Sequence, residues 1–386
     1  MKVVKATLYA LKIPFVESFG HSLKTRTFSD SIVARIESDN GVVGFGEGVA
    51  RPYVTGETVP SCLKYMKEWL WPQLANANFS NFNFNNDPIQ ILAFFESSLR
   101  DQESSNVIAW NAVRSAFELA VLDCWLKTHQ FSLSKILPPK RTIVVYSGVI
   151  TSSSTEKAIQ MAKYFKLFGM NQVKVKIGSE TDRERLSAIR EVLGSSVSLR
   201  VDANGAYSLD QAIKVLKEIA QFNIESVEQP LPRENFNDLA RLKSESPIPI
   251  MVDESIVTER DAEELIEKKA CDFFNLRLSK CGGIFRTLQI AKMAYKAGIK
   301  LQLGSQVGET AILSAVGRHV AAYLRNLSFV EGSFGTMLLS EDVSAESIKF
   351  GHGGKAPLLN GLGFGIHVKE EILTKYADQI IECGES

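Results

Sequence analysis

Seven polar residues, six ionisable and one amide, recur along the second half of the chain at nearly constant spacing. Each follows a short apolar run, and successive members are 25 to 27 residues apart. About this length makes one strand and one helix of a (β/α)8 barrel, in which roughly 250 residues form eight units. Because the carboxyl ends of parallel barrel strands meet at one face, we expect these side chains to converge there. They are Lys176, Asp202, Glu228, Asp253, Lys280, Gln306 and Glu331.

A Lys-x-Lys pattern opens the series. Lys174 and Lys176 share one face of a predicted strand, opposite Val173 and Val175, because side chains alternate between the two faces. Two neighbouring ammonium groups disfavour each other's protonated form, and burial acts in the same direction. Alone, the pattern is typical of a solvated strand face, but the downstream repeat favours chemistry. We predict Lys176, nearer the strand's end, as a base and Lys174 as the neighbour that lowers its pKa.

Three carboxylates follow consecutive predicted strands, namely Asp202, Glu228 and Asp253. Their mutual repulsion requires a cation, and hard oxygen ligands suit Mg²⁺ best, with Mn²⁺ also possible. Acidic residues also favour helix N-termini, which is the competing interpretation. Asn204 lies two residues beyond Asp202. It is a candidate for contact with substrate or with the metal ligands, or else a turn residue.

Lys280 follows the carboxylates, so around a barrel it should face Lys176 across the metal. That layout suits removal of a proton from one face of a carbon, with its return or charge stabilisation on the other. A bound divalent ion would take up the negative charge that develops on carboxylate oxygens as an enolate forms. These residues predict abstraction of the proton α to a carboxylate.

The elements that must position this series are short apolar runs that alternate with amphipathic stretches from about residue 142. This alternation is typical of βα units around a parallel sheet, and we take Ile143–Ser147 as its first strand and Leu327–Val330 as its last. Ser208 to Gln211 has the form of a capping box, and Gly194 is a helix terminator. The predicted fold class is α/β, with a (β/α)8 TIM-type barrel.

A first α+β domain is predicted before residue 130, with antiparallel strands to about residue 48 and three helical stretches at about 58–74, 88–100 and 107–127. Two of its segments mix polar and aromatic residues with glycine and are candidate ligand-binding loops. One is Phe15–Ser22, which contains Phe19 and His21, and the other is Gly48–Glu57, which contains Tyr53 and Thr55.

Composition narrows the class of protein. The 386 residues are 45% apolar and 23% charged, which suits a soluble globular chain that buries a large core. Forty-four basic and 44 acidic residues give no net charge, so neither nucleic acid nor a membrane is an expected partner. Five scattered cysteines predict reduced thiols. No signal peptide or membrane-spanning run is evident, so we expect a cytoplasmic location.

At these motifs the chain resembles the muconate-lactonizing subgroup of the enolase superfamily, over nearly its whole length. The resemblance implies enolate chemistry, Mg²⁺, a small carboxylate substrate and a homo-oligomer. It implies domains at 1–130 (a cap with two specificity loops), 131–355 (the barrel) and 356–386 (a tail returning to the cap). The matching motifs are Lys174-Val175-Lys176, Val201-Asp202-Ala203-Asn204, Val227-Glu228-Gln229-Pro230, Val252-Asp253-Glu254-Ser255 and Lys280-Cys281-Gly282-Gly283.

The reaction stays open among relatives of this kind. Val54-Thr55-Gly56-Glu57 resembles the capping loop of dipeptide epimerases, but Gly332-Ser333-Phe334-Gly335 replaces their Asp-x-Asp-Gly, which leaves Glu331 as the nearest carboxylate. Arg277 and Ser279 stand where many relatives carry Lys and Met. Glu309 resembles a family acid near the seventh strand, or is a helix-start charge.

We expect an isomerase: an epimerase or racemase of an amino-acid or dipeptide derivative, or a cycloisomerase. The alternative is a lyase, either an o-succinylbenzoate synthase or an acid-sugar dehydratase. A dehydratase ranks lower because Gln306 stands where its seventh-strand histidine is expected. The remaining hypothesis belongs to another functional class: a non-catalytic binding protein on this scaffold.

Overall fold

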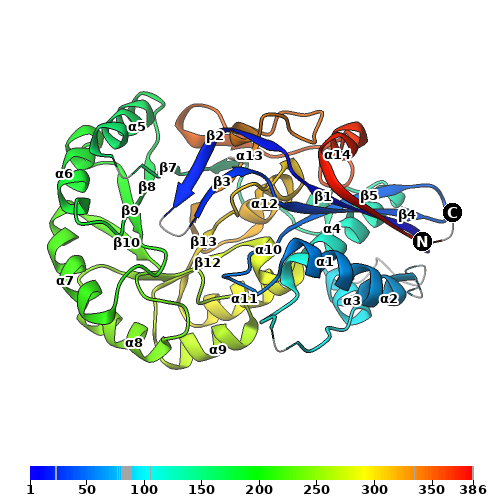
Figure 1. Ribbon diagram of the computed structural model, residues 1–386, viewed down its shortest axis with the longest axis horizontal. Helices are drawn as coiled ribbons and strands as arrows, with labels where there is room; N and C mark the ends of the chain where they lie inside the picture. Colours follow the sequence, from blue (N-terminus) through cyan, green and yellow to red (C-terminus); the bar gives the residue numbers. More distant parts are fainter. Residues whose placement is uncertain are drawn as a thin grey trace.

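A parallel barrel sheet and an antiparallel sheet beside it make up the computed structural model (Figure 1). The structure describes residues 1–21, 24–75, 77, 79, 89–104, 106–152, 154–333 and 335–384. The side chains of residues 17–21, 24, 25, 335 and 336 are outside this description. Among the predicted site residues, the side chains of Phe19 and His21 therefore lie outside the described part.

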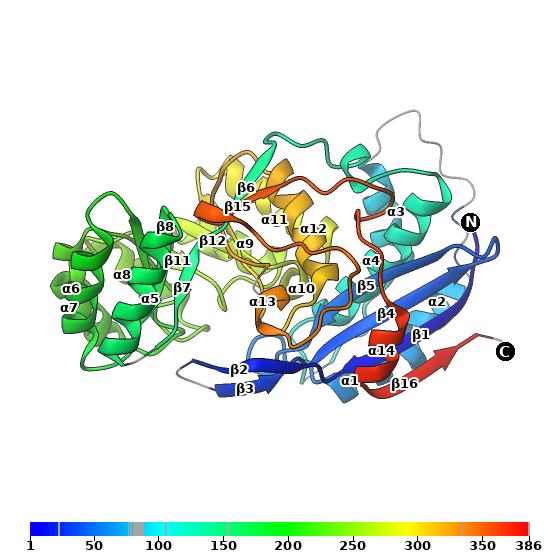
Figure 2. The same ribbon diagram turned by 90° about the horizontal axis from the view of Figure 1, so that it is seen from above.

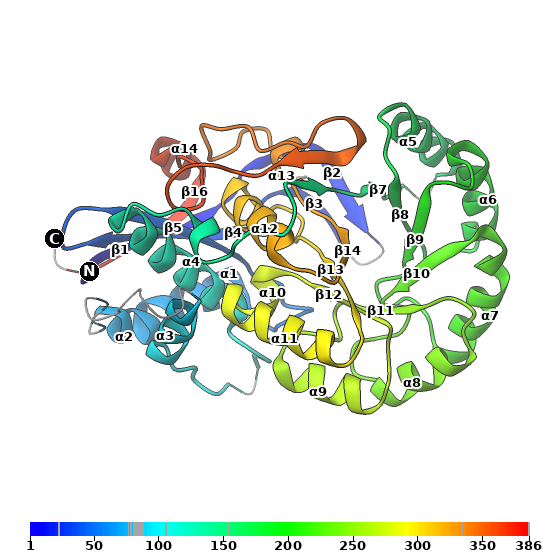
Figure 3. The same cartoon turned by 180° about the vertical axis from the view of Figure 1, so that it is seen from behind.

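Eight parallel strands form the barrel, in the order of the chain from β7 to β14 (Figure 3). Most residues of these strands are apolar, which suits strands buried on both faces. Lys174, Arg200, Asn275 and Gln302 are buried polar exceptions. The strands are β7 (Gly148–Ile150), β8 (Gln172–Lys176), β9 (Ser198–Asp202), β10 (Ile224–Glu228), β11 (Ile250–Val252), β12 (Phe273–Leu276), β13 (Lys300–Leu303) and β14 (Leu327–Val330).

Helices between the strands form the outer layer of the barrel (Figure 1). Ser208 and Thr258 open two of them with capping boxes, and Gly194 ends another, so the predicted start and stop signals at Ser208 and Gly194 are confirmed. The helices are α5 (Thr155–Leu167), α6 (Asp182–Leu193), α7 (Leu209–Ile219), α8 (Phe236–Glu245), α9 (Glu259–Glu267), α11 (Ile284–Lys296) and α12 (Ala311–Tyr323), with short α10 (Leu278–Cys281) and α13 (Gly335–Leu338).

The register of the strands places the first three predicted site positions level with one another. Lys176 is paired with Asp202, and Asp202 with Glu228. Glu228 is paired with Met251, so Asp253 follows two residues later, beyond the end of β11. The convergence that the spacing predicts is thus built by the hydrogen-bonded ladder itself.

The first barrel strand differs from the prediction. Ile143–Val145 forms β6, which pairs with β15 (Lys355–Pro357) outside the barrel sheet, and the barrel begins at Gly148. The apolar run at 143–147 is therefore split, and Ser147 N–H donates to Val330 O at 2.9 Å, where β7 meets β14. Between β14 and residue 351 the described chain has only the four-residue α13, so seven complete strand–helix units precede an eighth strand.

The antiparallel sheet has the strand order β16-β1-β4-β5 and includes the C-terminal tail. Its strands are β1 (Val3–Leu11), β4 (Ser31–Ser38), β5 (Val43–Val49) and β16 (Ala377–Cys383). The α/β class, with an N-terminal capping domain completed by the tail, is confirmed. Other elements of this domain and tail are α1 (Val59–Tyr65), a π-helix (Met66–Leu70), α2 (Trp71–Ala75), α3 (Gln90–Ser98), α4 (Asn111–Thr128) and α14 (Glu370–Tyr376), and single 3-10 turns occur at Leu133–Lys135, Ala220–Phe222 and His352–Gly354.

Three glycines let α4 lie directly on β5. Gly44, Gly46 and Gly48 share one face of the strand, and a Cβ at any of them would stand 1.9 to 2.3 Å from backbone atoms of α4. The predicted helix at 107–127 begins at Asn111, four residues later. The contact brings the capping domain against the barrel, because α4 also packs on α10.

The segment predicted as the first specificity loop is a strand. β2 (Pro14–His21) pairs with β3 (Lys24–Phe28) as an antiparallel hairpin, which extends from the antiparallel sheet toward β7 and α5 (Figure 2). The loop prediction is wrong for Phe15–His21, because its aromatic residues and Val16 fit a strand once a partner is present. Ser22 lies outside the described residues, and the role of the segment in specificity stays a prediction. The partner strand, Lys24–Phe28, has no apolar alternation that would identify it in the sequence.

Buried carboxylates join the capping domain to helices. Glu47 accepts hydrogen bonds from the backbone N–H groups of Thr310 and Leu313, and Glu118 accepts from those of Ile284 and Phe285. Such groups satisfy helix N-termini that otherwise lack partners. Burial raises the pKa of Glu47 to about 7, and burial followed by the nearby Glu96 raises that of Glu118 to about 8.

A pH-dependent loss of stability is expected from Glu118. Its folded-state pKa of about 8 exceeds the ordinary value of 4.5, so the folded chain binds this proton more tightly than the unfolded chain does. The stabilisation is complete below pH 4.5 and is lost as pH rises toward 8, by about 1.4 kcal/mol per pKa unit. Urea unfolding of wild type and Glu118→Gln from pH 5 to 8 measures this loss. As the pH rises, the free energy of unfolding of wild type should fall relative to that of Glu118→Gln. A pH-independent difference would contradict a neutral Glu118.

No helix in the described part of the chain is both long enough and apolar enough to cross a membrane.

Candidate active site

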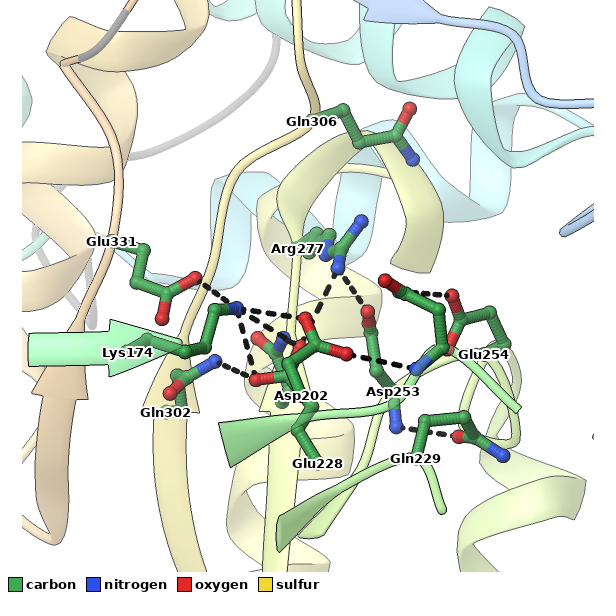
Figure 4. Close-up of polar contacts among 12 residues, drawn as sticks. Lys174, Asp202, Glu228, Gln229, Asp253, Glu254, Arg277, Gln302, Gln306 and Glu331 are labelled. Atoms are coloured by element: carbon green, nitrogen blue, oxygen red, sulfur yellow. Dashed lines mark hydrogen bonds and ion pairs between the residues drawn. The ribbon is translucent and has the colours of Figure 1, made fainter. Parts of the chain in front are cut away.

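Cations link the three predicted metal ligands in a row at the carboxyl ends of the strands (Figure 4). Lys174 Nζ lies 3.2 Å from Asp202 Oδ2 and 3.1 Å from Glu228 Oε2. Arg277 Nη2 contacts Asp253 Oδ2 and lies 3.7 Å from Glu228 Oε1. All three carboxylates are buried, at 0 to 1% exposure. The strand ends thus form one connected ionic cluster.

Lys176 is at the cavity side of this cluster. Its Nζ donates to Asp202 Oδ2 and to Asn204 Oδ1, both at 2.6 Å. Asn204 has a left-handed φ of 45°, and its Nδ2 donates to Glu254 Oε1 at 3.2 Å. Asn204 therefore orients Lys176 in addition to forming the turn after β9.

Lys174 lies deeper, with a side-chain exposure of 4%. Its Nζ also donates to Glu331 Oε2 at 2.6 Å, so three carboxylates surround one ammonium group. Burial alone would lower the pKa of Lys174, but Glu228, Glu331 and Asp202 together raise it well above its ordinary value. Lys174 is a permanently charged neighbour of Lys176, and the predicted influence of that charge on Lys176 stays a prediction.

The carboxylate of Asp253 is shared by Lys280 and Arg277. Lys280 Nζ donates to Asp253 Oδ1 at 2.8 Å and to the carbonyl oxygens of Asp253 and Asn275 at 2.6 and 2.7 Å. Lys280 is on α10, not at the strand end itself, and Arg277 is the residue before this helix. The two cations hold the two oxygens of Asp253 from one short turn of chain.

Below the cluster, amide and guanidinium groups occupy the barrel interior. Asn275 Nδ2 and Gln302 Nε2 each donate to Glu228 at 2.9 Å. Arg200 pairs with Glu331 at 3.2 Å. Burial, followed by Asp202, raises the pKa of Glu228 to about 8, whereas for Asp202 burial is outweighed by Lys176 and Lys174, which hold its pKa well below the ordinary range. The Glu228 carboxylate therefore favours the binding of a proton or of a further cation.

A cavity of about 1310 Å³ opens above the cluster. Lys174, Lys176 and Arg277 belong to its wall, whereas Asp202, Glu228, Asp253 and Lys280 lie beneath it. The charged residues that the structure describes on the wall are mostly basic. They are Arg26, Arg51, Lys157, Lys174, Lys176, Arg185 and Arg277 against Glu254, Glu309 and Glu331.

The remaining predicted site residues are divided between the cavity and its support. Tyr53, Asn204, Gln306, Glu309 and Glu331 line the cavity. Glu309 Oε1 accepts from the Gln306 backbone N–H at 2.6 Å, and burial raises the pKa of Glu309 to about 8. Thr55 is buried and hydrogen-bonds within its own turn, to the carbonyl of Arg51.

The donor set fits a hard divalent cation. Six carboxylate oxygens on three neighbouring strands face one end of the barrel, and hard oxygens are the ligands that Mg²⁺ prefers. Arg277 Nη2, between Glu228 and Asp253, marks a point where positive charge is already stabilised. Within the described residues, no three His, Cys, Asp or Glu side chains stand close enough together to form a metal site, since ammonium and guanidinium groups lie between them.

Comparison with known proteins identifies the class. The family model described as enolase C-terminal domain-like matches residues 156–372. The N-succinyl-L-Arg/Lys racemase of Bacillus cereus is 27% identical over 97% of both chains, and its crystal structure superposes with a TM-score of 0.89 at 25% identity, covering 99% of this chain and 100% of the other. The chain belongs to the enolase superfamily.

Two further relatives indicate the kind of reaction. A hydrophobic dipeptide epimerase of Enterococcus faecalis is 30% identical over 85% of this chain and 89% of its own. The structure of 2-chloromuconate cycloisomerase from Rhodococcus opacus has a TM-score of 0.87 at 25% identity, over 98% of this chain and all of the other. Within the superfamily the protein is an isomerase that abstracts the proton α to a carboxylate.

Several residues of the site were not among those predicted from the sequence. Arg26, Arg51 and Glu254 line the cavity, and Arg200, Asn275 and Gln302 support the carboxylates from below. Arg200 had a usable signal, because it lies two residues before Asp202 and so shares its face of the strand. Arg51 lies in the predicted ligand-binding segment Gly48–Glu57. Arg26 had no such signal, because its approach to the barrel depends on how the two domains meet.

Proposed function

We propose that the protein is a Mg²⁺-dependent racemase of N-acylated amino acids whose acyl group carries a second carboxylate. The observation that supports this most directly is the charge of the cavity wall, where seven basic residues stand against three acidic ones among those described. Six of these seven cations are also paired with acids: Lys174, Lys176 and Arg277 with the carboxylate cluster, Arg26 and Arg51 with Asp30, and Arg185 with Asp182. Lys157 has no ion-pair partner among the described residues, so a substrate with two carboxylates complements the wall better than one with a free ammonium group does.

The acidic residues on the wall support the same choice. A free α-ammonium needs an unengaged carboxylate nearby, and Glu331 is the acid at the end of β14. Glu331 is already held by Lys174 at 2.6 Å and Arg200 at 3.2 Å, and the next residue, Gly332, has no side chain where the resemblance implies an acid. A dipeptide with a free amino group therefore lacks its counter-ion at this strand end.

The proposed roles follow from position. Lys176 takes the α-proton, since its Nζ is at the cavity wall and is held by Asp202 and Asn204. Lys280, whose Nζ is held by Asp253 Oδ1, serves the opposite face of the α-carbon and returns the proton there. Asp202, Glu228 and Asp253 would hold Mg²⁺, with Mn²⁺ as the alternative ion, and the ion would supply positive charge for the substrate's carboxylate oxygens as they become more negative.

The relatives agree with a substrate of this class. The racemase of Bacillus cereus is named for N-succinyl-Arg and N-succinyl-Lys, and it spans this chain almost completely. We also propose a cytoplasmic location and a homo-oligomer, the first supported by five buried, unpaired cysteines.

Exchange of the α-hydrogen in D₂O tests the proposal. We expect Mg²⁺-dependent deuterium incorporation into N-succinyl amino acids, at a rate at least about tenfold above that of the matched N-acetyl compounds, because a lost charge-assisted contact costs about 1.5–3 kcal/mol. Mass spectrometry of both enantiomers, with dipeptides and muconate in the same panel, provides the measurement. Faster exchange in dipeptides than in N-succinyl compounds, or no exchange in any carboxylate, would refute the substrate class.

A further inference from the structure

We propose that Arg277 is a built-in counter-ion of the metal-ligand carboxylates, which the divalent cation must displace in order to bind. Arg277 would therefore set the metal affinity of the site. The inference rests on the proposed function only in taking Asp202, Glu228 and Asp253 as the metal ligands.

The position of the guanidinium group is the first support. Arg277 Nη2 contacts Asp253 Oδ2 and lies 3.7 Å from Glu228 Oε1. A divalent ion coordinated by these two side chains would need the same space and the same oxygens. Mg²⁺ would bind its oxygens at about 2.0–2.1 Å, closer than either of the two lysines that share Asp202 Oδ2, so a divalent ion would repel a guanidinium group on the same oxygen more strongly than the lysines repel each other. Coordination of a metal there and the present contacts of Arg277 exclude each other.

The chemistry of arginine makes displacement the only way to remove its charge. A lysine in such a cluster can lose its proton when a second cation approaches, but a guanidinium group stays protonated in proteins. The side chain must therefore move away when a metal binds.

The cavity provides the place to which Arg277 can move. The residue already lines the cavity wall, above the carboxylates that lie beneath it. Glu254 and Glu309 are on the same wall, and Glu254 Oε2 has no hydrogen-bond partner among the described residues. A guanidinium group that leaves Asp253 thus finds acidic groups at the cavity surface, and its departure uncovers the metal ligands.

Lys280 makes the exchange local. It holds Asp253 Oδ1 at 2.8 Å and is anchored by two backbone carbonyls, so Asp253 stays in place when Arg277 releases Oδ2. Lys280 is also 1% exposed and does not line the cavity, whereas Arg277 does. Movement of Arg277 would open the route from the cavity to Lys280 as well as to the carboxylates.

Mg²⁺ titration by calorimetry, without substrate, tests the inference. Chelator-treated wild type, Arg277→Gln and Arg277→Lys are compared, with Lys157→Met as the control that removes a cation from the same cavity wall but not from the carboxylates. We expect Arg277→Gln to bind Mg²⁺ at least tenfold more tightly than wild type, Arg277→Lys to bind with intermediate affinity, and Lys157→Met to match wild type.

Thermal unfolding provides a second reading. Arg277→Gln should unfold at a lower temperature than wild type without Mg²⁺ and show a larger rise on its addition, because the ion replaces the lost counter-ion. If Arg277→Gln does not fold, labelling of wild-type arginines with a dicarbonyl reagent decides: Arg277 should become more reactive when Mg²⁺ is present.

Unchanged or weaker Mg²⁺ affinity in Arg277→Gln would overturn the inference, as would labelling that is the same with and without the ion. Affinity equally increased in Lys157→Met would also overturn it, because the effect would then belong to the general charge of the cavity. Failure of the α-hydrogen exchange assay leaves these binding results unaffected, so the inference and the proposed function fail separately.

Discussion

Replacement of Lys176 by alanine is expected to lower the rate of α-hydrogen exchange by about 10²- to 10⁴-fold, the range typical of a positioned base. Lys176 is at the cavity wall, and its Nζ is fixed at 2.6 Å from both Asp202 and Asn204. Because alanine removes the base but not the substrate-binding residues, the loss should fall on kcat with little change in KM. Steady-state rates of deuterium incorporation into each enantiomer measure both constants.

The two enantiomers distinguish the lysines. Lys176 and Lys280 are proposed to serve opposite faces of the α-carbon. Lys176→Ala should therefore lower the exchange rate of one enantiomer more than that of the other, and Lys280→Ala should show the reverse preference. Lys163→Ala, which removes an exposed lysine from α5, should exchange at the wild-type rate. Wild-type turnover in Lys176→Ala would rule out this lysine as the base.

The carboxylate and lysine positions were predictable because a barrel repeats its geometry. Lys176, Asp202 and Glu228 are at equivalent registers, so constant sequence spacing becomes proximity in space. The same rule could have identified more of the site. Arg200 is two residues before Asp202 and points to the same side of the sheet, and a buried arginine among apolar strand residues is costly unless it is paired.

Other features depend on contacts between distant segments. Ile143–Val145 reads as a barrel strand, and only its pairing with Lys355–Pro357 shows that it lies outside the barrel. The hairpin of β2 and β3 likewise exists through pairing. Arg277 follows β12 and precedes a single helical turn, so periodicity predicts neither its direction nor its contacts with Asp253 and Glu228. Local pattern describes an element, whereas its partners are set by the whole chain.

The burial of Lys174 leads to the largest expected effect on stability. Three carboxylates surround its Nζ, at 3.2 Å (Asp202), 3.1 Å (Glu228) and 2.6 Å (Glu331). Methionine in its place would preserve much of the side-chain volume but leave these buried charges without their cation. Removal of one partner from a buried ion pair typically costs about 3–5 kcal/mol, so Lys174→Met should lose about that much unfolding free energy.

A double-mutant cycle separates the charge effect from a packing effect. Glu331→Gln removes the carboxylate closest to Lys174 while keeping its shape, so Lys174→Met combined with Glu331→Gln leaves one buried negative charge fewer than Lys174→Met alone. The double variant should therefore lose less stability than the sum of the two single variants, by about 0.5–3 kcal/mol. Urea unfolding at pH 7 provides the four values, with Lys163→Met as the exposed control. Strict additivity would mean that Lys174 stabilises the barrel through packing, and that its charge is not what holds the carboxylates at the strand ends.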